Sequence, residues 1–439
     1  MNIKTCALAL SALLLTSLSV VAQSSGPFPV EGRQTLYKTP GAQGAPYRIP
    51  AIVTAPNGDI FALSDFRPCG ADIGYGEVDI MCRISKDNGA TWGEEFCIAD
   101  GTGDDRSDVW RVGFGDAAVV ADAERNELLV MMVCGKTVCW NGNYLPGDPK
   151  SNPNRVARVR AKWNRKTGEW EWTKPEEVTE SVYSIFVDES GKPTVQSLFI
   201  GSGRIFQSRK VKVDDYYRLY CSVWTKNGGN RVIYSDDFGE SWKVLGALTD
   251  RPAPNGDEPK CEELPDGSVI LSSRSGFDGR VFNIFTFTDI KKGTGTWGKQ
   301  AVSNEKNRGV VSQKNATNGE IMLVEALRKS DGERVCLALQ SVPFGPGRSH
   351  VGVYYKEMTP DLYADTEALA ADWTRGLQIS DRGSAYSTMT WQKDRRFGFF
   401  YEEEPGGYQM VYLPLTIEQL TDGNYLTPPV KRRWWKRSR

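Results

Sequence analysis

Histidine is almost absent from this chain: His350 is the only one among 439 residues. A Ser-His-Asp or Cys-His mechanism would have to use His350, and no Gly-x-Ser-x-Gly nucleophile elbow accompanies it. The chain has no Cys-x-x-Cys pair, so a zinc site would be unusual, and it has no P-loop or dinucleotide fingerprint. We therefore predict no metal and no cofactor. Any chemistry must come from carboxylates, arginines, hydroxyls and tyrosine.

A charge excess of either sign is also missing, because 54 Lys and Arg face 55 Asp and Glu. Binding to nucleic acid through a basic face needs a clear Lys and Arg excess, so this class of partner is excluded. The one local excess is a basic tail at residues 431–439. A solvated terminus is the interpretation we favour for it, and a tail that touches a membrane or a polyanion is the alternative.

A long apolar run occurs only at the N-terminus, where Lys4 precedes an apolar stretch at 7–21 and then Ala22-Gln23. This order of charged, apolar and small residues is typical of a secretory signal, and the run is too short for a stable transmembrane helix. We predict a signal peptide at 1–22 and a secreted or periplasmic protein without stable membrane insertion. Cys6 precedes the apolar run, which argues against a lipoprotein anchor.

After cleavage eight cysteines would remain, an even number in a compartment that permits disulfides. Cys134 and Cys139 are close enough in sequence to close a short loop. Eight cysteines allow 105 connectivities, however, and the sequence does not choose among them.

No linker or abrupt change of composition divides the rest of the chain, so we predict one domain at 23–430. Strand-length apolar runs alternate with turn signals such as Asn57-Gly58 and Asp266-Gly267, which indicates an all-β fold. Helix is expected only near 361–373 and 417–420, and 141–153 is expected to be a long loop. The sequence does not give the oligomeric state; a monomer is favoured.

An eight-residue pattern, Ser-x-Asp-x-Gly-x-(Thr/Ser)-Trp, occurs at 85–92 and again at 235–242. Asp and Ser bond nearby backbone, Gly supplies positive φ and Trp anchors the turn in the core. The two starts, 85 and 235, are about three periods of the roughly 40 to 50 residues of a propeller blade apart. The repeat predicts a β-propeller. A third, broken copy runs from Thr288 to Gly293, with Trp297 after it.

The segment Tyr47-Arg48-Ile49-Pro50 together with these repeats resembles the exo-α-sialidases (neuraminidases) of the bacterial and animal type, from about residue 37 to about 420. The resemblance implies a six-bladed propeller in which the repeats, the Asp boxes, are structural. It implies that Arg48 is the first of three arginines that hold the sialic acid carboxylate. By the same resemblance Asp72 matches the acid/base aspartate. Arg67 and, more loosely, Asp116 match the arginine and the acid near the 4-hydroxyl.

The segment 257–267, which leads into Arg274, resembles the family's block with a catalytic glutamate and the second arginine. Glu258 fits the catalytic position, and Glu262 and Glu263 compete for it.

Arg348 is the best match for the third arginine, with Arg328 and Arg334 as alternatives. The segment 384–389 resembles the family's nucleophile segment and places the nucleophile at Tyr386.

The resemblance implies an exo-α-sialidase that removes terminal α-linked sialic acids from glycoproteins, glycolipids or oligosaccharides, with retention, through a covalent tyrosyl intermediate. A sialylated glycan is the expected partner. The same residues are compatible with transfer to a sugar acceptor or with intramolecular release, which are the alternatives within the enzyme class. A sialoglycan-binding propeller without catalysis should lack Tyr386, Glu258 or Asp72. An Asp-box glucanase or a protein-binding propeller should lack the three arginines.

Overall fold

The computed structural model describes residues 31–104, 109–276, 278–312 and 317–429. The predicted signal peptide at 1–22 and the basic tail at 431–439 lie outside these residues and stay predictions. Within the described part of the chain, no helix has the length and apolarity needed to cross a membrane.

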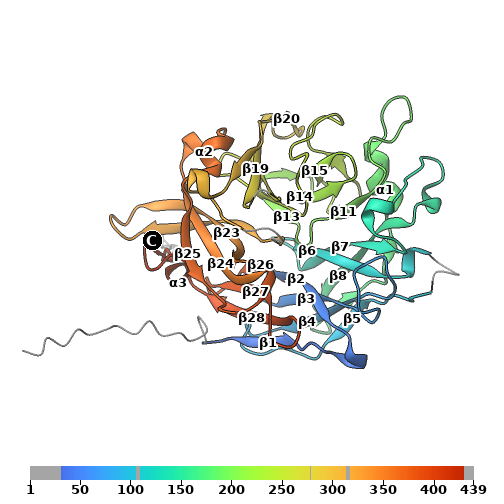
Figure 1. The fold of residues 1–439 in the computed structure, drawn as a ribbon, viewed down its shortest axis with the longest axis horizontal. Coiled ribbons are helices and arrows are strands. Elements are labelled where there is room, and N and C mark those ends of the chain that lie inside the picture. Colours follow the sequence, from blue (N-terminus) through green and yellow to red (C-terminus); the bar gives the residue numbers. More distant parts are fainter. Residues whose placement is uncertain (1–30, 105–108, 277, 313–316, 430–439) are drawn as a thin grey trace, which may run out of the picture.

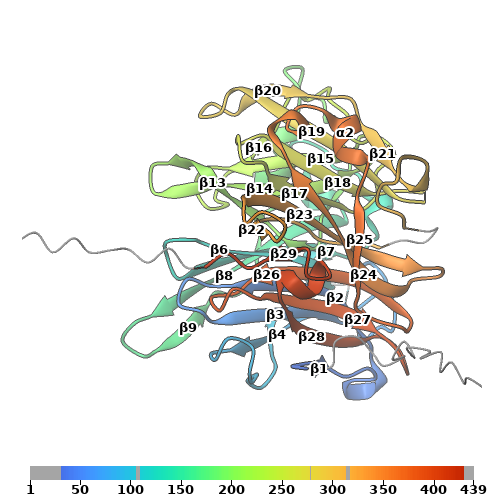
Figure 2. The same ribbon diagram turned by 90° about the vertical axis from the view of Figure 1, so that its left-hand side faces the viewer.

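Six β-sheets stand around a common centre, so the predicted six-bladed propeller is confirmed (Figure 1). The colours in Figure 1 pass around this centre in chain order. Figure 2 shows β3 (Ile60–Phe66) and β4 (Asp79–Ser85) on the opposite side of the ring from β19 (Arg280–Asp289) and β20 (Thr294–Trp297).

The blades follow one another along the chain. Blade 1 contains β2 (Tyr47–Thr54), β3 (Ile60–Phe66), β4 (Asp79–Ser85) and β5 (Phe96–Ala99). Blade 2 contains β6 (Phe114–Ala121), β7 (Glu127–Gly135), β8 (Asn154–Asn164), β9 (Glu169–Trp172), β10 (Glu176–Glu177) and, beside β6, β12 (Gly203–Arg204). Blade 3 contains β11 (Leu198–Ile200), β13 (Phe206–Val213), β14 (Tyr216–Thr225), β15 (Gly229–Ser235) and β16 (Lys243–Val244).

Blade 4 contains β17 (Pro259–Glu263), β18 (Val269–Arg274), β19 (Arg280–Asp289), β20 (Thr294–Trp297) and β21 (Ala301–Ser303). Blade 5 contains β22 (Ile321–Arg328), β23 (Arg334–Gly345), β24 (Ser349–Met358), β25 (Thr374–Gln378) and β29 (Tyr425–Leu426). Blade 6 contains β26 (Ser384–Trp391), β27 (Phe397–Glu403), β28 (Gln409–Leu415) and β1 (Gln34–Tyr37). The pairing of β1 with β28 closes the ring with the two ends of the described chain.

Helix is scarce, as predicted. Three short α-helices are present in the described residues: α1 (Thr179–Tyr183), α2 (Thr366–Ala370) and α3 (Ile417–Leu420). The last two lie in the two stretches where helix is expected. α1 lies outside them, so the expectation of helix in only those two stretches is wrong. Short 3-10 turns occur at Ala42–Gly44, Val109–Arg111, Cys139–Asn141, Pro149–Ser151, Ser184–Phe186, Glu305–Asn307 and Pro360–Leu362.

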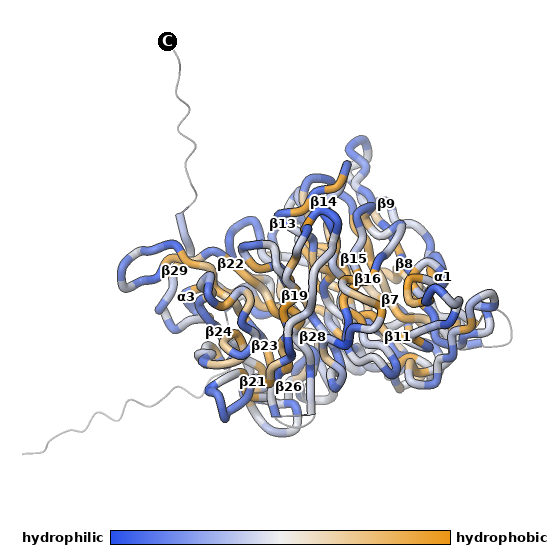
Figure 3. The backbone as a smooth tube through the Cα atoms, turned by 90° about the horizontal axis from the view of Figure 1, so that it is seen from above, coloured by the Kyte–Doolittle hydropathy of each residue, from blue (hydrophilic) through white to orange (hydrophobic). Residues whose placement is uncertain are grey.

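The hydrophobic core lies between neighbouring blades. Phe61 and Leu63 of blade 1, for example, share a buried cluster with Val119 and Val130 of blade 2. Because each blade packs on a neighbour through both faces, its middle strands are apolar on both sides, and the sequence shows continuous runs rather than strict alternation. In Figure 3 the hydrophobic segments follow the strands, and the hydrophilic ones follow the outer loops.

Both Asp boxes form the same turn between the third and fourth strands of a blade. Asp87 Oδ1 accepts the backbone N–H of Thr91 at 2.8 Å, and Asp237 Oδ1 accepts that of Ser241 at 2.9 Å. The boxes belong to blades 1 and 3, so the expected spacing of three blade periods is wrong. Blade 2 takes up more of the chain than an average blade because long connections lie between β7 and β8 and between β10 and β11.

The eight cysteines of the described chain are all free thiols, so the loop closure considered for Cys134 and Cys139 is not formed. Both side chains are buried. Burial raises the pKa of the Cys139 thiol to about 12, because the thiolate loses its hydration.

Candidate active site

A cavity of about 320 Å³ lies where the N-terminal ends of the inner strands converge. The structure brings all eight predicted site residues to its wall: Arg48, Arg67, Asp72, Asp116, Glu258, Arg274, Arg348 and Tyr386. They come from blades 1, 2, 4, 5 and 6, so only closure of the ring brings them together. The other wall residues are Ile49, Ile73, Val133, Val138, Cys139, Trp140, Phe199 and Asp257.

Backbone irregularities aim several of these side chains into the cavity. The pairing of β2 with β3 slips between Arg48 and Pro50, and Ile49 between them has φ 55°. Asp116 has φ 54° at a similar slip in β6, and Arg348 has φ 63°. Left-handed backbone at non-glycine residues is uncommon and costs about 1 to 3 kcal/mol, and bulges re-aim side chains next to active sites. The surrounding structure must stabilise these three backbone conformations, and such strained residues cluster at functional sites.

The three predicted clamp arginines surround one phenol ring. The guanidinium carbons of Arg48 and Arg348 lie 5.7 Å and 5.6 Å from the centroid of the Tyr386 ring. Nη1 of Arg274 lies 3.4 Å from the Tyr386 hydroxyl. Three cations around one small cavity form a strong site for a carboxylate, because guanidinium groups give planar, charge-assisted hydrogen bonds to it.

Glu402 orients the first of these arginines. Its carboxylate accepts Nε of Arg48 at 2.8 Å and Nη2 at 3.2 Å, and it also accepts the backbone N–H groups of Ile49 and Tyr386. Glu402 is 0% exposed, so this fully buried carboxylate is satisfied by four donors. The sequence analysis did not single out Glu402. A charged residue inside the apolar strand β27 was the one available signal.

Tyr386 and Glu258 form a hydrogen-bonded pair in which the phenol donates to Oε1 of Glu258. The other oxygen, Oε2, accepts Nη1 of Arg274 at 3.0 Å. Burial and the negative charge of Glu258 hold the pKa of Tyr386 well above its usual range, and Arg274 opposes this shift. The phenol is therefore protonated at neutral pH and has a proton acceptor in contact.

Asp72 lies across the cavity, on the loop between β3 and β4. Its side chain is 58% exposed, and its Oδ1 lies 2.8 Å from Nη2 of Arg67. Arg67 also contacts the buried carboxylate of Asp65 at 3.0 Å, a residue that sequence reasoning missed. Burial, together with the charges of Asp72 and Asp65, raises the pKa of Asp116 well above its ordinary value. The Arg67 guanidinium thus pairs with two carboxylates, those of Asp65 and Asp72, on this side of the cavity.

The residues just before the loop expected at 141–153, and not the loop itself, form one wall of the cavity. Trp140 stands just before it, is 58% exposed and lines the cavity beside Val138. Phe199 and Val133 extend the same apolar wall. The cavity therefore has a charged side and an apolar side, which is how ligand pockets fix the orientation of an amphipathic molecule.

The competing glutamates lie elsewhere. Glu262 and Glu263 occupy the far end of β17, where Glu262 pairs with Arg204 at 2.9 Å and Arg209 at 2.7 Å.

The competing arginines also lie away from the cavity wall. Arg328 pairs with Glu357, and Arg334 pairs with Glu325. His350 interacts with its neighbour Ser349 and is not part of the cavity wall.

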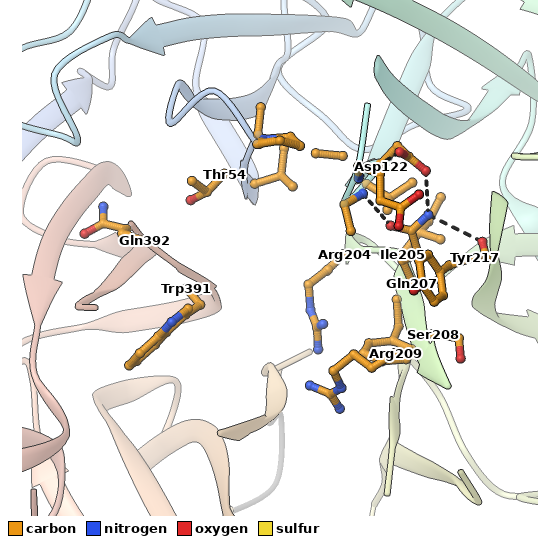
Figure 4. Close-up of a pocket in the computed structure, with 18 of the residues that line it drawn as sticks. Thr54, Asp122, Arg204, Ile205, Gln207, Ser208, Arg209, Tyr217, Trp391 and Gln392 are labelled. Carbon is orange, nitrogen blue, oxygen red and sulfur yellow. Dashed lines mark hydrogen bonds between the residues drawn. The ribbon is translucent and has the colours of Figure 1, made fainter. Parts of the chain in front are cut away.

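A larger cavity, about 730 Å³, opens at the C-terminal ends of the inner strands (Figure 4). Figure 4 shows Arg204 and Arg209 on one side of it and Trp391 on the other. Both arginines pair with the buried Glu262, and none of the eight predicted site residues lies on the wall of this cavity. The smaller cavity is the candidate active site.

Comparisons with known proteins agree with this architecture. The family model for BNR repeat-like domains matches residues 49–342. A sialidase of Micromonospora viridifaciens is 25% identical over 409 residues, which cover 89% of this chain and 57% of that protein. A sialidase of Paraclostridium sordellii is 25% identical over 363 residues, 81% of each chain. The solved structure of Trypanosoma rangeli sialidase with the inhibitor DANA has a TM-score of 0.62 at 18% identity, over 87% of this chain and 59% of that one. The chain thus spans only part of the first of these relatives.

Proposed function

This chain belongs to the family of BNR repeat-like domains, and on that basis we propose that it is an exo-α-sialidase that releases terminal α-linked sialic acid with retention of configuration. The observation that carries the proposal is the Tyr386–Glu258 pair inside a ring of three arginines. Asp72 lies on the same cavity. Glycoproteins, glycolipids and oligosaccharides that end in sialic acid are the proposed substrates.

The carboxylate of sialic acid explains why a phenol suits the nucleophile position. This group is attached to the anomeric carbon, so an Asp or Glu nucleophile within about 4 Å would meet roughly 4 kcal/mol of repulsion at an effective dielectric constant of 20. Neutral Tyr386 avoids this repulsion. Sialidases with a tyrosine nucleophile are a recognised exception among glycosidases, which otherwise use two carboxylates.

Glu258 takes the phenolic proton as Tyr386 attacks the anomeric carbon. Without a base, ionising a phenol of ordinary pKa at pH 6 would cost about 1.36 kcal/mol for each of about four pH units. The proton acceptor in contact makes the transfer concerted with attack. Arg274, bonded to Glu258, balances the negative charge of the pair until attack on the anomeric carbon removes that charge.

Arg48, Arg274 and Arg348 hold the substrate carboxylate and so select an acidic monosaccharide. Each charge-assisted hydrogen bond contributes about 1.5 to 3 kcal/mol. Glu402 fixes the plane of the Arg48 guanidinium in advance, which lowers the entropy lost on binding.

Asp72 protonates the glycosidic oxygen and later draws a proton from water, which completes two displacements with net retention. Its exposed position on a loop gives it access to the leaving group and to water. The ion pair with Arg67 has to loosen when Asp72 carries the proton.

The test is an assay of α2,3-, α2,6- and α2,8-linked sialosides side by side, with products followed by NMR. Free sialic acid that appears first as the α-anomer supports the proposal. Anhydro product or a new sialoside would indicate intramolecular release or transfer by the same residues. No turnover of any linkage by folded protein would refute the proposal and leave a sialoglycan-binding propeller.

A further inference from the structure

Arg280 is a fully buried arginine behind the candidate active site. It begins β19 and is 0% exposed. Arg274 lies directly opposite it in the β18–β19 register, and the backbone N–H of Arg274 donates to the carbonyl of Glu258, which immediately precedes β17. Because residues opposite each other in antiparallel strands share a face, Glu258, Arg274 and Arg280 form one row across three strands.

No carboxylate of the described chain lies within ion-pair distance of the Arg280 guanidinium, and its hydrogen-bond partners are neutral. Nε donates to Oγ of Ser272 at 3.1 Å, Nη2 to the Ser272 carbonyl at 3.1 Å and Nη1 to the Thr317 carbonyl at 3.3 Å. Burial and the neighbouring Arg274 lower the pKa of Arg280 to about 9, although the negative charges of Glu258, Glu320 and Asp257 oppose this shift. An unpaired buried cation is costly, so hydrophobic packing alone does not account for it.

The hydrogen bonds of Arg280 connect it, through Thr317, with the residue before Tyr386. Thr317, which accepts from Arg280, donates through its hydroxyl to the carbonyl of Ala385 at 3.0 Å. Ala385 immediately precedes Tyr386, and both lie where the pairing of β26 with β27 slips. The chain of contacts therefore connects blade 4, which carries Glu258, with the irregular backbone of blade 6, which carries Tyr386.

A second series of hydrogen bonds connects Arg280 with blade 5. The Ser272 hydroxyl that accepts from Arg280 donates to Oε1 of Gln340 at 2.7 Å. Ser272, Thr317, Ala385 and Gln340 are each 0% exposed, so water does not compete for these bonds. Arg280 is thus a buried junction of three blades directly behind the Tyr386–Glu258 pair.

We propose that Arg280 and Thr317 are positioning residues that set the separation between the Tyr386 hydroxyl and Glu258. This inference rests on the proposed function for its kinetic consequences. The backbone slip leaves Tyr386 without the regular ladder on its N-terminal side, and the Thr317 hydroxyl supplies a fixed point there. Reactions between held groups are sensitive to displacement, and a misplacement of about 1 Å can cost roughly 100-fold in rate.

The test compares Thr317→Val with Thr317→Ser. Valine keeps the volume and removes the hydroxyl, whereas serine keeps the hydroxyl. We expect Thr317→Val to lower kcat about 10-fold with KM changed less than about twofold, and Thr317→Ser to keep wild-type kcat. We also expect the pH dependence of kcat to shift in Thr317→Val only, because the proton transfer from Tyr386 to Glu258 is affected.

Thr421→Val is the matched control. Thr421 is also 0% exposed and donates to a backbone carbonyl, that of Ile417, at 2.8 Å, but it lies after α3, away from the cavity wall. This variant should lose stability and keep kcat. If Thr317→Val has the kcat and pH profile of Thr421→Val, the inference is overturned.

Arg280→Lys gives a second test if Thr317→Val does not fold. Lysine keeps the charge and loses the planar fork, so kcat should fall about 100-fold. Arg218→Lys, at another 0% exposed arginine, one that pairs with Asp236, should not change kcat. Equal kcat in both lysine variants would overturn the inference.

A crystal structure separates failure of this inference from failure of the proposed function. If the wild type turns over no sialoside, the proposed function fails. The Tyr386–Glu258 separation in the crystal structure of Thr317→Val then tests the positioning role without any kinetic measurement. In Thr317→Val the Tyr386 hydroxyl should leave hydrogen-bond distance of Glu258. An unchanged Tyr386–Glu258 contact would refute the role of Thr317.

Discussion

Replacing Arg274 with alanine should abolish most sialoside turnover while the propeller stays folded. The Arg274 guanidinium contacts Oε2 of Glu258 at 3.0 Å, Oδ2 of Asp257 at 3.4 Å and the Tyr386 hydroxyl at 3.4 Å. Its removal therefore deletes a substrate contact and also leaves the partly buried Glu258 without its cation. Both effects act on the transition state.

The magnitude follows from these contacts. A charge-assisted bond to the substrate carboxylate contributes about 1.5 to 3 kcal/mol, and a displacement of Glu258 by about 1 Å costs roughly 100-fold in rate, or about 2.7 kcal/mol. Arg274 is 18% exposed, so we expect a combined loss near the lower bounds, about 3 to 5 kcal/mol. This corresponds to a fall in kcat/KM of about 100- to 5,000-fold.

The assay separates the two effects with a modified substrate. We compare an aryl sialoside with its carboxamide analogue, in both wild type and Arg274→Ala. The preference of the wild type for the carboxylate should shrink in the variant by about 10- to 100-fold, which is the coupling between Arg274 and that group. Loss of the Glu258 contact affects both substrates equally.

Arg308→Ala is the control, since Arg308 is 81% exposed and pairs with Asp372 on the surface. It should leave kcat/KM and the melting temperature unchanged. Unchanged kcat/KM in Arg274→Ala would refute the clamp assignment. A large loss of activity with an undiminished preference for the carboxylate would refute the contact with substrate and leave only the contact with Glu258.

Three further predictions concern the nucleophile, its neighbour and a buried acid. Tyr386→Phe should lower kcat at least about 1,000-fold and abolish the covalent sialyl adduct that mass spectrometry detects with a slow fluorinated sialoside; an adduct in the variant would exclude Tyr386. Glu402→Gln should leave Arg48 uncompensated, lower the free energy of unfolding by about 3 kcal/mol and raise KM; wild-type values in denaturant unfolding and kinetics would contradict this. The pKa of Asp79 is raised from 3.8 to about 7, chiefly by burial, so its contribution to stability is present below about pH 4 and is lost as the pH rises through 7. Between pH 4 and 8 the wild type should therefore lose up to about 4 kcal/mol of unfolding free energy relative to Asp79→Asn, and parallel stability curves would refute the shift.

Local chemistry was readable in the sequence because it is complete within a few residues. Each Asp box carries its own serine, aspartate, glycine and tryptophan, and the hydrogen bonds of Asp87 and Asp237 close inside the eight-residue pattern. The motif around Arg48 and the segment around Tyr386 were recognisable for the same reason. These elements predicted the propeller and eight of the residues that line the cavity.

The spacing of the blades was misjudged because it depends on insertions rather than on the repeat. Blade 2 lies between the two Asp boxes and contains long connections. The interval from 85 to 235 therefore spans two blade steps and not the three that an average period implies. Pairing of cysteines was equally undetermined, because it depends on which strands become neighbours.

Only the tertiary structure revealed Glu402, Asp65 and Arg280 as parts of the site. Arg48 and Glu402 are separated by 354 positions, and nothing near either residue indicates the other. The ring closes when β1 joins β28, and that closure decides which charged side chains face each other at the centre. The sequence by itself determined the turns, the apolar strands and the reactive residue types. Closure of the ring determined how those residues combine, because electrostatic partnership depends on distance in space.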